Sequence, residues 1–164
     1  MIRLLACLTA ATLALAAPAS AQTSRGNYSD WHVFTLDGPD GLVCYALTTP
    51  TEMTPQNVDH GQVFFMVSSW ANNQAREQPR FISGYTLRPD NPPRARIGSD
   101  RFDMFVADRD GFVEETEDER RLVRAMKAGA VMRVEATSQR GTATAYEFSL
   151  SGITAALNRV EELC

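Results

Sequence analysis

The sequence predicts a mainly β domain with two short helices, and three observations carry this prediction. Most segments alternate apolar and polar residues with a period of two, or form short apolar runs bounded by turn residues, as strands do. Two segments, about 116–128 and 152–163, instead repeat every three to four residues, as helices do. Without a leader of 21 residues, 143 of the 164 residues remain, enough for one domain with a hydrophobic core.

Residues 1–21 have the pattern of a secretory signal peptide. Arg3 provides a positive start, an apolar run extends from Leu4 to about Ala17, and Ala19-Ser20-Ala21 provides the small residues of a cleavage site. We expect cleavage after Ala21 and export from the cytoplasm. The alternative is an uncleaved anchor, but the run is short and diluted with Ala and Thr, so no stable membrane span is expected after cleavage.

The mature chain begins with polar residues 22–29, which we expect to form a flexible leader to a single domain over 30–164. The turn-rich segment 37–41 predicts a hairpin between its flanking strands. A loop is predicted over 50–61, which contains two prolines. In this half of the chain, strands are predicted over 30–36, 42–49, 62–70 and 81–87.

The second half begins with a predicted loop over 88–96, followed by a strand over 101–107. Asp-Gly at 110–111 favours a hairpin turn there. The clearest hairpin joins residues 130–138 to 142–150 around Arg140-Gly141. In its first strand Met132, Val134 and Ala136 are predicted to face inward, and Arg133, Glu135 and Thr137 outward.

Each predicted helix has an identifiable end or face. Thr116 is expected to be the N-cap of the first helix, with Glu119 completing a capping box, and Gly129 is expected to close it. In the second helix one stripe holds the apolar anchors together with the terminal cysteine, so that cysteine should face the sheet. The residues of this stripe are Ile153, Leu157, Val160 and Cys164.

Loss of the leader also removes Cys7, which leaves Cys44 and Cys164. An even pair of cysteines in an exported chain predicts a disulfide. This bond would join the last helix to the second predicted strand and close nearly the whole mature chain. Two free buried thiols are the alternative.

Composition and motifs argue against several function classes. With Arg3 removed, 15 basic residues face 20 acidic ones, and this acidic balance disfavours nucleic acid as a partner. No nucleophile elbow, phosphate-binding glycine loop or dinucleotide fingerprint occurs, so we expect no catalytic residues and no cofactor. His32 and His60 lack the paired spacing of a metal site, so no metal is expected. Asp108–Gly111 resembles only the start of a calcium loop.

The arginines are the one suggestive feature for binding. Six of them, from Arg76 to Arg101, fall in one loop-rich stretch, directly before an acidic run over 108–119. One interpretation is a two-signed surface that docks a partner, and the other is ordinary solvated loops. The candidate binding arginines are Arg76, Arg80, Arg88, Arg94 and Arg96. The aromatic residues Trp31, Phe64, Phe65 and Trp70 are expected in the core rather than on a binding surface.

The segments "DWHVFTLDGPDGLVCYALTTP" (30–50) and "AMKAGAVMRVEATSQRGTATAYEFSLSGITAAL" (125–157), with Cys164, resemble the invasion-associated locus B family of alphaproteobacterial exported proteins. The resemblance spans residues 30–164. The chain departs from the family at Ile153, where an aromatic residue is frequent, and in having fewer cysteines than many members. The resemblance implies an immunoglobulin-like β-sandwich in the periplasm or envelope of a Gram-negative bacterium, with no agreed catalytic residues to transfer.

We therefore expect a non-enzymatic binding or interaction module, with an envelope or host-surface protein as partner and a possible link to host-cell invasion. The alternative is an enzyme or enzyme inhibitor with a site among the loops that hold His60 and the arginines. Convergence of His60, an acid and an arginine in one cleft would favour that alternative.

Overall fold

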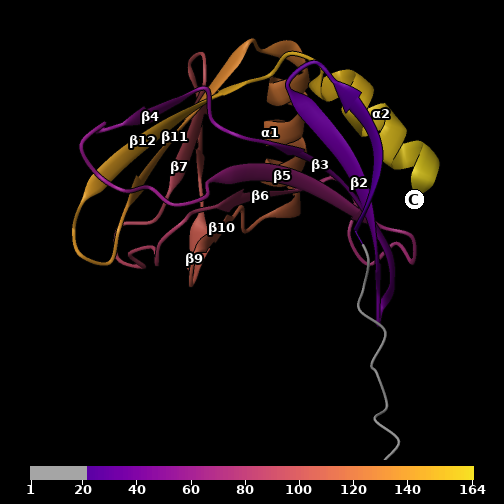
Figure 1. Cartoon of the computed structure of the whole chain (residues 1–164), viewed down its shortest axis with the longest axis horizontal. Coiled ribbons are helices and arrows are strands. Elements are labelled where there is room, and N and C mark those ends of the chain that lie inside the picture. The colour runs from indigo at the N-terminus through magenta and orange to yellow at the C-terminus, as the bar shows by residue number, and fades with distance from the viewer. Residues whose placement is uncertain (1–21) are drawn as a thin grey trace, which may run out of the picture.

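The computed structural model describes residues 22–164, which form two antiparallel sheets packed as a sandwich with two helices (Figure 1). The seven-stranded sheet has the order β1 (Gln22–Tyr28), β2 (Trp31–Gly38), β3 (Gly41–Thr48), β5 (Phe64–Trp70), β6 (Gln78–Ile82), β10 (Asp110–Phe112), β9 (Phe105–Ala107). The five-stranded sheet has the order β4 (Glu52–Thr54), β12 (Ala143–Ser149), β11 (Val131–Thr137), β7 (Arg94–Ile97), β8 (Asp100–Asp103). The mainly β fold class is confirmed. The expected signal peptide lies outside the described residues.

The hairpins fix the register of both sheets. Strands β2 and β3 pair from His32↔Leu47 to Gly38↔Gly41, which leaves a two-residue turn between them. Strands β11 and β12 pair along their whole length, from Val131↔Ser149 to Thr137↔Ala143. Since side chains alternate between the faces of a strand, this register places Met132, Val134 and Ala136 in the core, as predicted.

The core lies between the sheets and is rich in aromatic side chains. Phe65 of β5 and Phe81 of β6 both meet Phe148 of β12 edge to face, with ring centroids 5.8 and 6.5 Å apart. Trp31 is fully buried, and its indole Nε1–H donates to the carbonyl of Ser149 at 3.0 Å. This bond satisfies the one polar group that the Trp31 side chain brings into the core.

The second layer over the seven-stranded sheet is completed by helix α2 (Ile153–Leu163). This helix packs against β1, β2, β3 and β5, to one side of the five-stranded sheet (Figure 1). It buries Ile153, Leu157 and Val160, the stripe predicted from the sequence. Gly152 precedes it with a φ of +91°, and a Cβ there would lie 2.0 Å from the carbonyl oxygen of Tyr28. Glycine is therefore required where β1 meets the start of α2.

Helix α1 (Thr116–Ala128) spans the predicted residues, but it is not capped as predicted. Its N-cap is Glu115, Thr116 is the first helical residue, and no side chain caps the helix by a hydrogen bond. Gly129 does close the helix. A Cβ on Gly129 would lie 2.6 Å from Ile97 Cγ2, so close packing requires glycine there.

Cys44 and Cys164 form the predicted disulfide, with Cα atoms 6.0 Å apart across 120 positions. Cys44 is fully buried in β3, and Cys164 is the C-cap of α2. The bond therefore fixes the end of α2 to a central strand of the larger sheet. It indicates an oxidising compartment outside the cytoplasm. Neither helix in the described part of the chain has the length and hydrophobicity that a membrane span requires.

Two segments expected to be irregular are strands. Residues 22–28 were expected in a flexible leader but form β1, which pairs with β2 from Gln22↔Leu36 to Tyr28↔Trp31. Polar edge strands carry weak sequence signals, because only their backbone pairing holds them in the sheet. The predicted loop over 50–61 contains β4, a three-residue edge strand beside β12.

Three strand boundaries also differ from the prediction. Strand β6 covers Gln78–Ile82 rather than 81–87, and β7 (Arg94–Ile97) begins inside the predicted loop over 88–96 and ends one residue beyond it. The predicted strand over 101–107 divides at Met104 into β8 and β9, which belong to different sheets. Met104 is buried between them. Local pattern cannot reveal this division, because each half is itself a short strand.

Candidate functional site

The outer faces of the two sheets differ in chemistry. In β2, β3, β5 and β6 alternate side chains point away from the sandwich, and most of these are apolar, although no sheet or helix among residues 22–164 covers them. We call this surface the apolar face. It consists of Phe34, Leu36, Val43, Tyr45, Leu47, Phe64, Met66, Trp70, Ile82, Phe105 and Phe112. An apolar area this continuous on one side of a domain is typical of a binding surface.

A groove of ≈ 660 Å³ lies in the apolar face. Its walls come from strands β2, β3, β5, β6 and β10, with one residue of β1. Such a volume is within the usual range for small-molecule sites. Phe105 and Phe34 extend the apolar surface at its ends, since Phe105 stacks on Phe112 and Phe34 packs on Tyr45.

The groove contains a few polar side chains on β5 and β6. Arg80 binds Asp110 of β10 through Nη2, at 2.5 Å from Oδ2, and its guanidinium lies 5.4 Å from the centroid of Phe112. Arg80 Nε is buried and has no hydrogen-bond partner among the described residues. The same holds for Oγ of Ser68, a residue that is only 2% exposed. The groove therefore contains two buried donors that residues 22–164 do not satisfy.

Tyr45 forms part of the groove wall on β3. Partial burial raises the pKa of the Tyr45 hydroxyl above its usual value, because removal from water disfavours the phenolate. At neutral pH this side chain therefore adds an uncharged, largely apolar surface to the groove.

The outer face of the five-stranded sheet, which we call the charged face, carries charges of both signs. Its register places Arg94 beside Asp103 and Glu135, and Arg133 beside Glu147 and Arg96. The charged face consists of Glu52, Arg94, Arg96, Arg101, Asp103, Arg133, Glu135 and Glu147.

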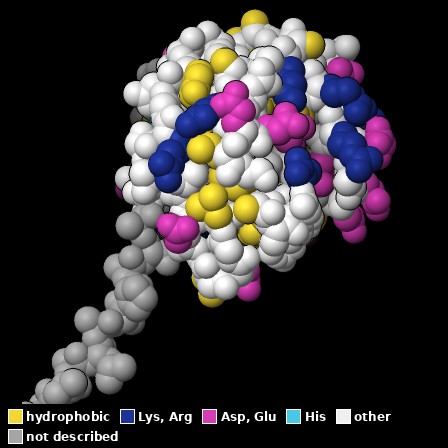
Figure 2. Space-filling view, turned by 90° about the vertical axis from the view of Figure 1, so that its right-hand side faces the viewer, with side chains coloured by type: hydrophobic (Ala, Val, Ile, Leu, Met, Phe, Trp, Pro, Cys, Tyr) yellow, Lys and Arg dark blue, Asp and Glu magenta, His cyan; other side chains and the backbone are white. Residues whose placement is uncertain are grey.

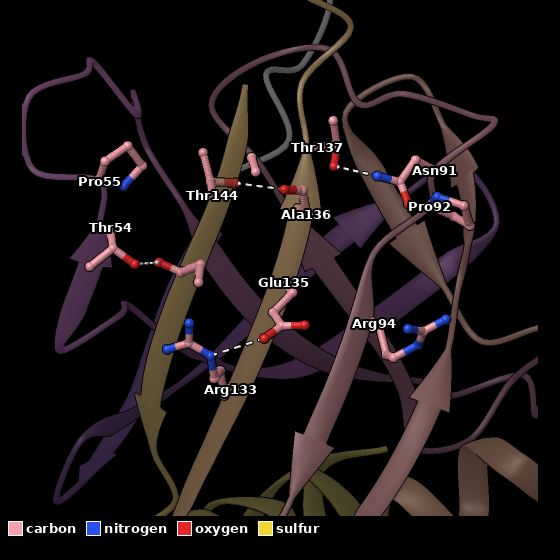
Figure 3. A pocket seen from close by; sticks show the side chains of 12 residues that line it. Thr54, Pro55, Asn91, Pro92, Arg94, Arg133, Glu135, Ala136, Thr137 and Thr144 are labelled. Atoms are coloured by element: carbon pink, nitrogen blue, oxygen red, sulfur yellow. Dashed lines mark hydrogen bonds and ion pairs between the residues drawn. The ribbon is translucent and has the colours of Figure 1, made fainter. Parts of the chain in front are cut away.

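A depression of ≈ 480 Å³ lies on this face (Figure 3). Its polar groups mostly bind one another. Arg133 Nε lies 3.2 Å from a Glu135 oxygen, and Asn91 Nδ2 donates to Thr137 Oγ1 at 2.8 Å, as Figure 3 shows. Because these groups already have partners, the depression offers a ligand fewer free donors than the groove on the apolar face.

His60 lies in a buried hydrogen-bond network at one end of the sandwich. Because a carbonyl oxygen only accepts, His60 Nε2 donates to Pro55 O at 2.9 Å, and in that tautomer Nδ1 accepts from the Tyr146 hydroxyl at 2.9 Å. Tyr146 also bonds Tyr85, which bonds Thr144 at 2.5 Å. Burial raises the pKa of Tyr146 far above its usual value. Both His60 ring nitrogens are thus occupied by structural partners.

The structure does not bring the five candidate arginines together. Arg80 lies in the groove, Arg94 and Arg96 lie on the opposite sheet, and the other two lie in loops. In those loops Arg76 binds Asn73 and Arg88 binds Asp90. A cleft where His60, an acid and an arginine converge is not formed by these residues.

The acidic run is likewise spread over different surroundings. Asp110, from the calcium-like segment, binds Arg80, and Glu117 and Asp118 pair with arginines of their own helix. On the side of the molecule seen in Figure 2, basic and acidic side chains alternate, with hydrophobic side chains between them. The exposed His32 bonds Asn27 across the β1–β2 hairpin at 2.7 Å. These contacts stabilise local structure.

Two of the four aromatic residues expected in the core lie elsewhere. Trp31 and Phe65 are buried between the layers, but Phe64 and Trp70 line the groove on the apolar face. Consecutive residues of a strand point to opposite faces, so Phe64 and Phe65 cannot both face inward. Odd and even positions of β3 and β5 both carry apolar residues, and this pattern indicates that the outer face of the sheet is apolar as well as the inner one.

The comparisons with known proteins give one result. A family model described as "Invasion associated locus B (IalB) protein" matches residues 31–161, most of the chain, so the chain belongs to this family. Neither the comparison with curated proteins nor that with solved structures found a match.

Proposed function

We propose that this member of the invasion associated locus B family is an exported, non-enzymatic binding module that works through its apolar face. The observation that carries the proposal is the groove across the larger sheet, formed by aromatic and aliphatic side chains where an isolated domain would gain from polar ones. The signal-peptide pattern and the disulfide support a site of action in the periplasm or cell envelope. The immunoglobulin-like topology and a link to host-cell invasion remain expectations from the family resemblance.

Placement of the polar residues favours this function over a catalytic one. His60 is 7% exposed and has both nitrogens bound, and the sulfur of Cys44 is bonded to Cys164 rather than available as a thiolate. A general base or nucleophile would need to reach a substrate. The unpartnered donors instead lie within an apolar groove, an arrangement that orients a ligand.

The proposal can be tested with two matched surface variants in the native organism. Leu47→Asp places a charge in the groove, and Glu135→Gln makes a change on the charged face. Each variant should replace the wild type in a deletion strain, and any envelope phenotype of that strain should be scored. We expect Leu47→Asp to behave like the deletion and Glu135→Gln like the wild type. Full function of correctly folded Leu47→Asp would overturn the proposal.

A further inference from the structure

We propose that the groove binds a long acyl chain and recognises the neutral carbonyl oxygen of its ester through Ser68 and Arg80. This inference rests on the proposed function and specifies the ligand chemistry of the same site. It follows from the buried donors, from the shape of the groove and from the local charge.

Two buried hydrogen-bond donors in the groove indicate that the ligand carries an acceptor. Ser68 Oγ and Arg80 Nε are both buried and lack hydrogen-bond partners among the described residues. Ser68 lies opposite Gln78 in the β5–β6 register, and Arg80 lies opposite Met66, so the two donors occupy neighbouring positions on adjacent strands. Buried polar groups in proteins are almost always hydrogen-bonded, and the exceptions call for a specific explanation. An acceptor oxygen of a bound molecule would supply the missing partner where it enters between the side chains that cover these atoms.

The shape of the groove matches a linear apolar chain. It extends across the strands from Leu36 on β2 to Phe112 on β10, which lie four strand intervals apart. At the usual spacing of neighbouring strands, the width across the strands is about 19 Å. Leu36 lies four residues along β2 from the position in register with Phe112, so the path runs diagonally and is longer than this width. Between these ends Leu47 and Met66 contribute flexible aliphatic side chains, and Trp70 contributes a broad apolar surface. A single acyl chain could lie along this path.

The small number of polar groups argues against a peptide in extended conformation. Each residue of such a peptide brings one N–H and one C=O that need partners when buried. The groove lies on the face of the sheet, so the backbone groups at the sheet edges are not available to pair with a peptide strand. Two free donors suit a ligand with one acceptor group and a long apolar remainder.

The local charge favours a neutral acceptor over a carboxylate. The positive charge of Arg80 is already offset by Asp110, whose carboxylate lies 2.5 Å from Nη2. A ligand carboxylate at Arg80 Nε would bring a second negative charge close to Asp110 in a poorly hydrated site, and like charges there repel. An ester carbonyl accepts the same hydrogen bonds without this repulsion.

Calorimetric titration of the purified exported protein with three probes that each carry a twelve-carbon chain tests the inference. The probes are monolauroylglycerol, the dodecyl ether of glycerol, which lacks the carbonyl, and laurate, which carries a charge. We expect monolauroylglycerol to bind most tightly, with roughly three- to tenfold lower affinity for the ether, because one or two hydrogen bonds are lost. Fluorescence of Trp70 in the groove provides a second reading.

Matched variants separate recognition from folding. Ser68→Ala removes an unpartnered buried hydroxyl, so it should leave the melting temperature unchanged or raise it, yet lower affinity for the ester to that for the ether. Ser69→Ala is the control, because its inward Oγ accepts from the backbone N–H of Glu77 at 3.0 Å. We expect that variant to lose stability and keep the preference for the ester.

The outcomes test two claims, that the groove binds an acyl chain and that it recognises a neutral carbonyl. Equal binding of ester and ether, unaltered by Ser68→Ala, would overturn carbonyl recognition and leave the groove as an apolar binding site. Tighter binding of laurate than of the ester would overturn the claim that the recognised acceptor is uncharged. If no probe binds but the groove captures a helical polypeptide in a Leu47-dependent manner, the acyl ligand is wrong and the binding module stands. Binding of the ester that survives Leu47→Asp would place the ligand elsewhere and overturn the inference.

Discussion

The two outer faces of this sandwich both belong to antiparallel sheets, but their polar side chains differ in exposure and in hydrogen bonding. On the charged face Arg94 and Asp103 lie 2.5 Å apart, with half or more of each side chain in water. On the apolar face Arg80 and Asp110 lie at the same distance, but their side chains are only 34% and 21% exposed. Two arginine–aspartate pairs of equal length therefore lie in environments that differ in exposure to water.

This difference separates a surface whose polar side chains are satisfied by one another and by water from one that we propose to bind a ligand. On the charged face, ion pairs and solvent together satisfy the side chains, so nothing further is required of a partner. On the apolar face, aromatic side chains extend the apolar surface at the ends of the groove, and two donors within it have no partner among the described residues. A domain gains no stability from that arrangement by itself, which supports the proposed role of this face in binding.

The largest expected effect concerns the support beneath the apolar face. Cys44 lies between Val43 and Tyr45, both in the groove wall, and its bond to Cys164 ties α2 under this part of the sheet. We expect Cys44→Ala and Cys164→Ala each to lower the free energy of unfolding by about 2–4 kcal/mol. Hydrogen exchange should rise more in β1–β3 than in β11 and β12.

The double variant Cys44→Ala/Cys164→Ala is the control for that prediction. Because both substitutions break the same bond, the free energy of unfolding of the double variant should be no lower than that of the less stable single variant. Additive losses would show that the two side chains act independently and that the bond contributes little. Uniform loss of protection across both sheets would contradict a local support of the groove.

The next effect concerns the polar network between the two faces. Tyr146→Phe removes the hydroxyl that bonds His60 and Tyr85, leaving buried groups without a partner. We expect a loss of about 1–3 kcal/mol in urea unfolding, without a change in ligand binding at the apolar face. Lost binding in a folded Tyr146→Phe variant would mean that the network belongs to the functional site.

The same hydroxyl predicts an alkaline limit to stability. The pKa of Tyr146 is raised in the folded protein above its value of 10.0 in the unfolded chain. The stability from keeping it neutral is therefore fully present below pH 10 and is lost as pH rises above that value. We expect the free energy of unfolding to fall above pH 10, and to fall less steeply in Tyr146→Phe. Identical slopes would contradict the assignment.

The smallest effect compares the two ion pairs directly. Asp103→Asn on the charged face should cost at most about 1 kcal/mol, and this cost should vanish in high salt. Asp110→Asn leaves Arg80 without its carboxylate in the groove and should cost about 1–2 kcal/mol, between the ranges for exposed and buried pairs. Equal, salt-sensitive losses in denaturant titrations would show that the two environments do not differ.

Much of the fold could be predicted from the sequence, because strong local patterns decide it. The alternation in β11 and β12, the apolar stripe of α2 and the even pair of cysteines each indicated the correct structure. These features depend on residues that the chain itself places on one face. Family membership over 31–161 agrees with the resemblance seen in the same segments.

The errors share a physical cause, since they concern contacts that local pattern does not encode. Strand β1 is polar and exists because β2 offers an edge, and Met104 divides one apolar run between two sheets. The prediction that Phe64 and Trp70 lie in the core is wrong and hides the apolar face, because the alternation of strands does not allow Phe64 and Phe65 both to face inward. The arginines were grouped by sequence, and the fold distributes them over opposite sheets.

The central claim is that the apolar face, and not the charged face, meets the ligand. Photo-crosslinking in intact cells tests it most directly, with a photoreactive amino acid placed at Phe112 in the groove or at Glu135 on the charged face. The account predicts a discrete adduct from position 112 that disappears when Leu47→Asp is added, and none from position 135. Adducts from position 135 alone, or adducts from position 112 that survive Leu47→Asp, would contradict it.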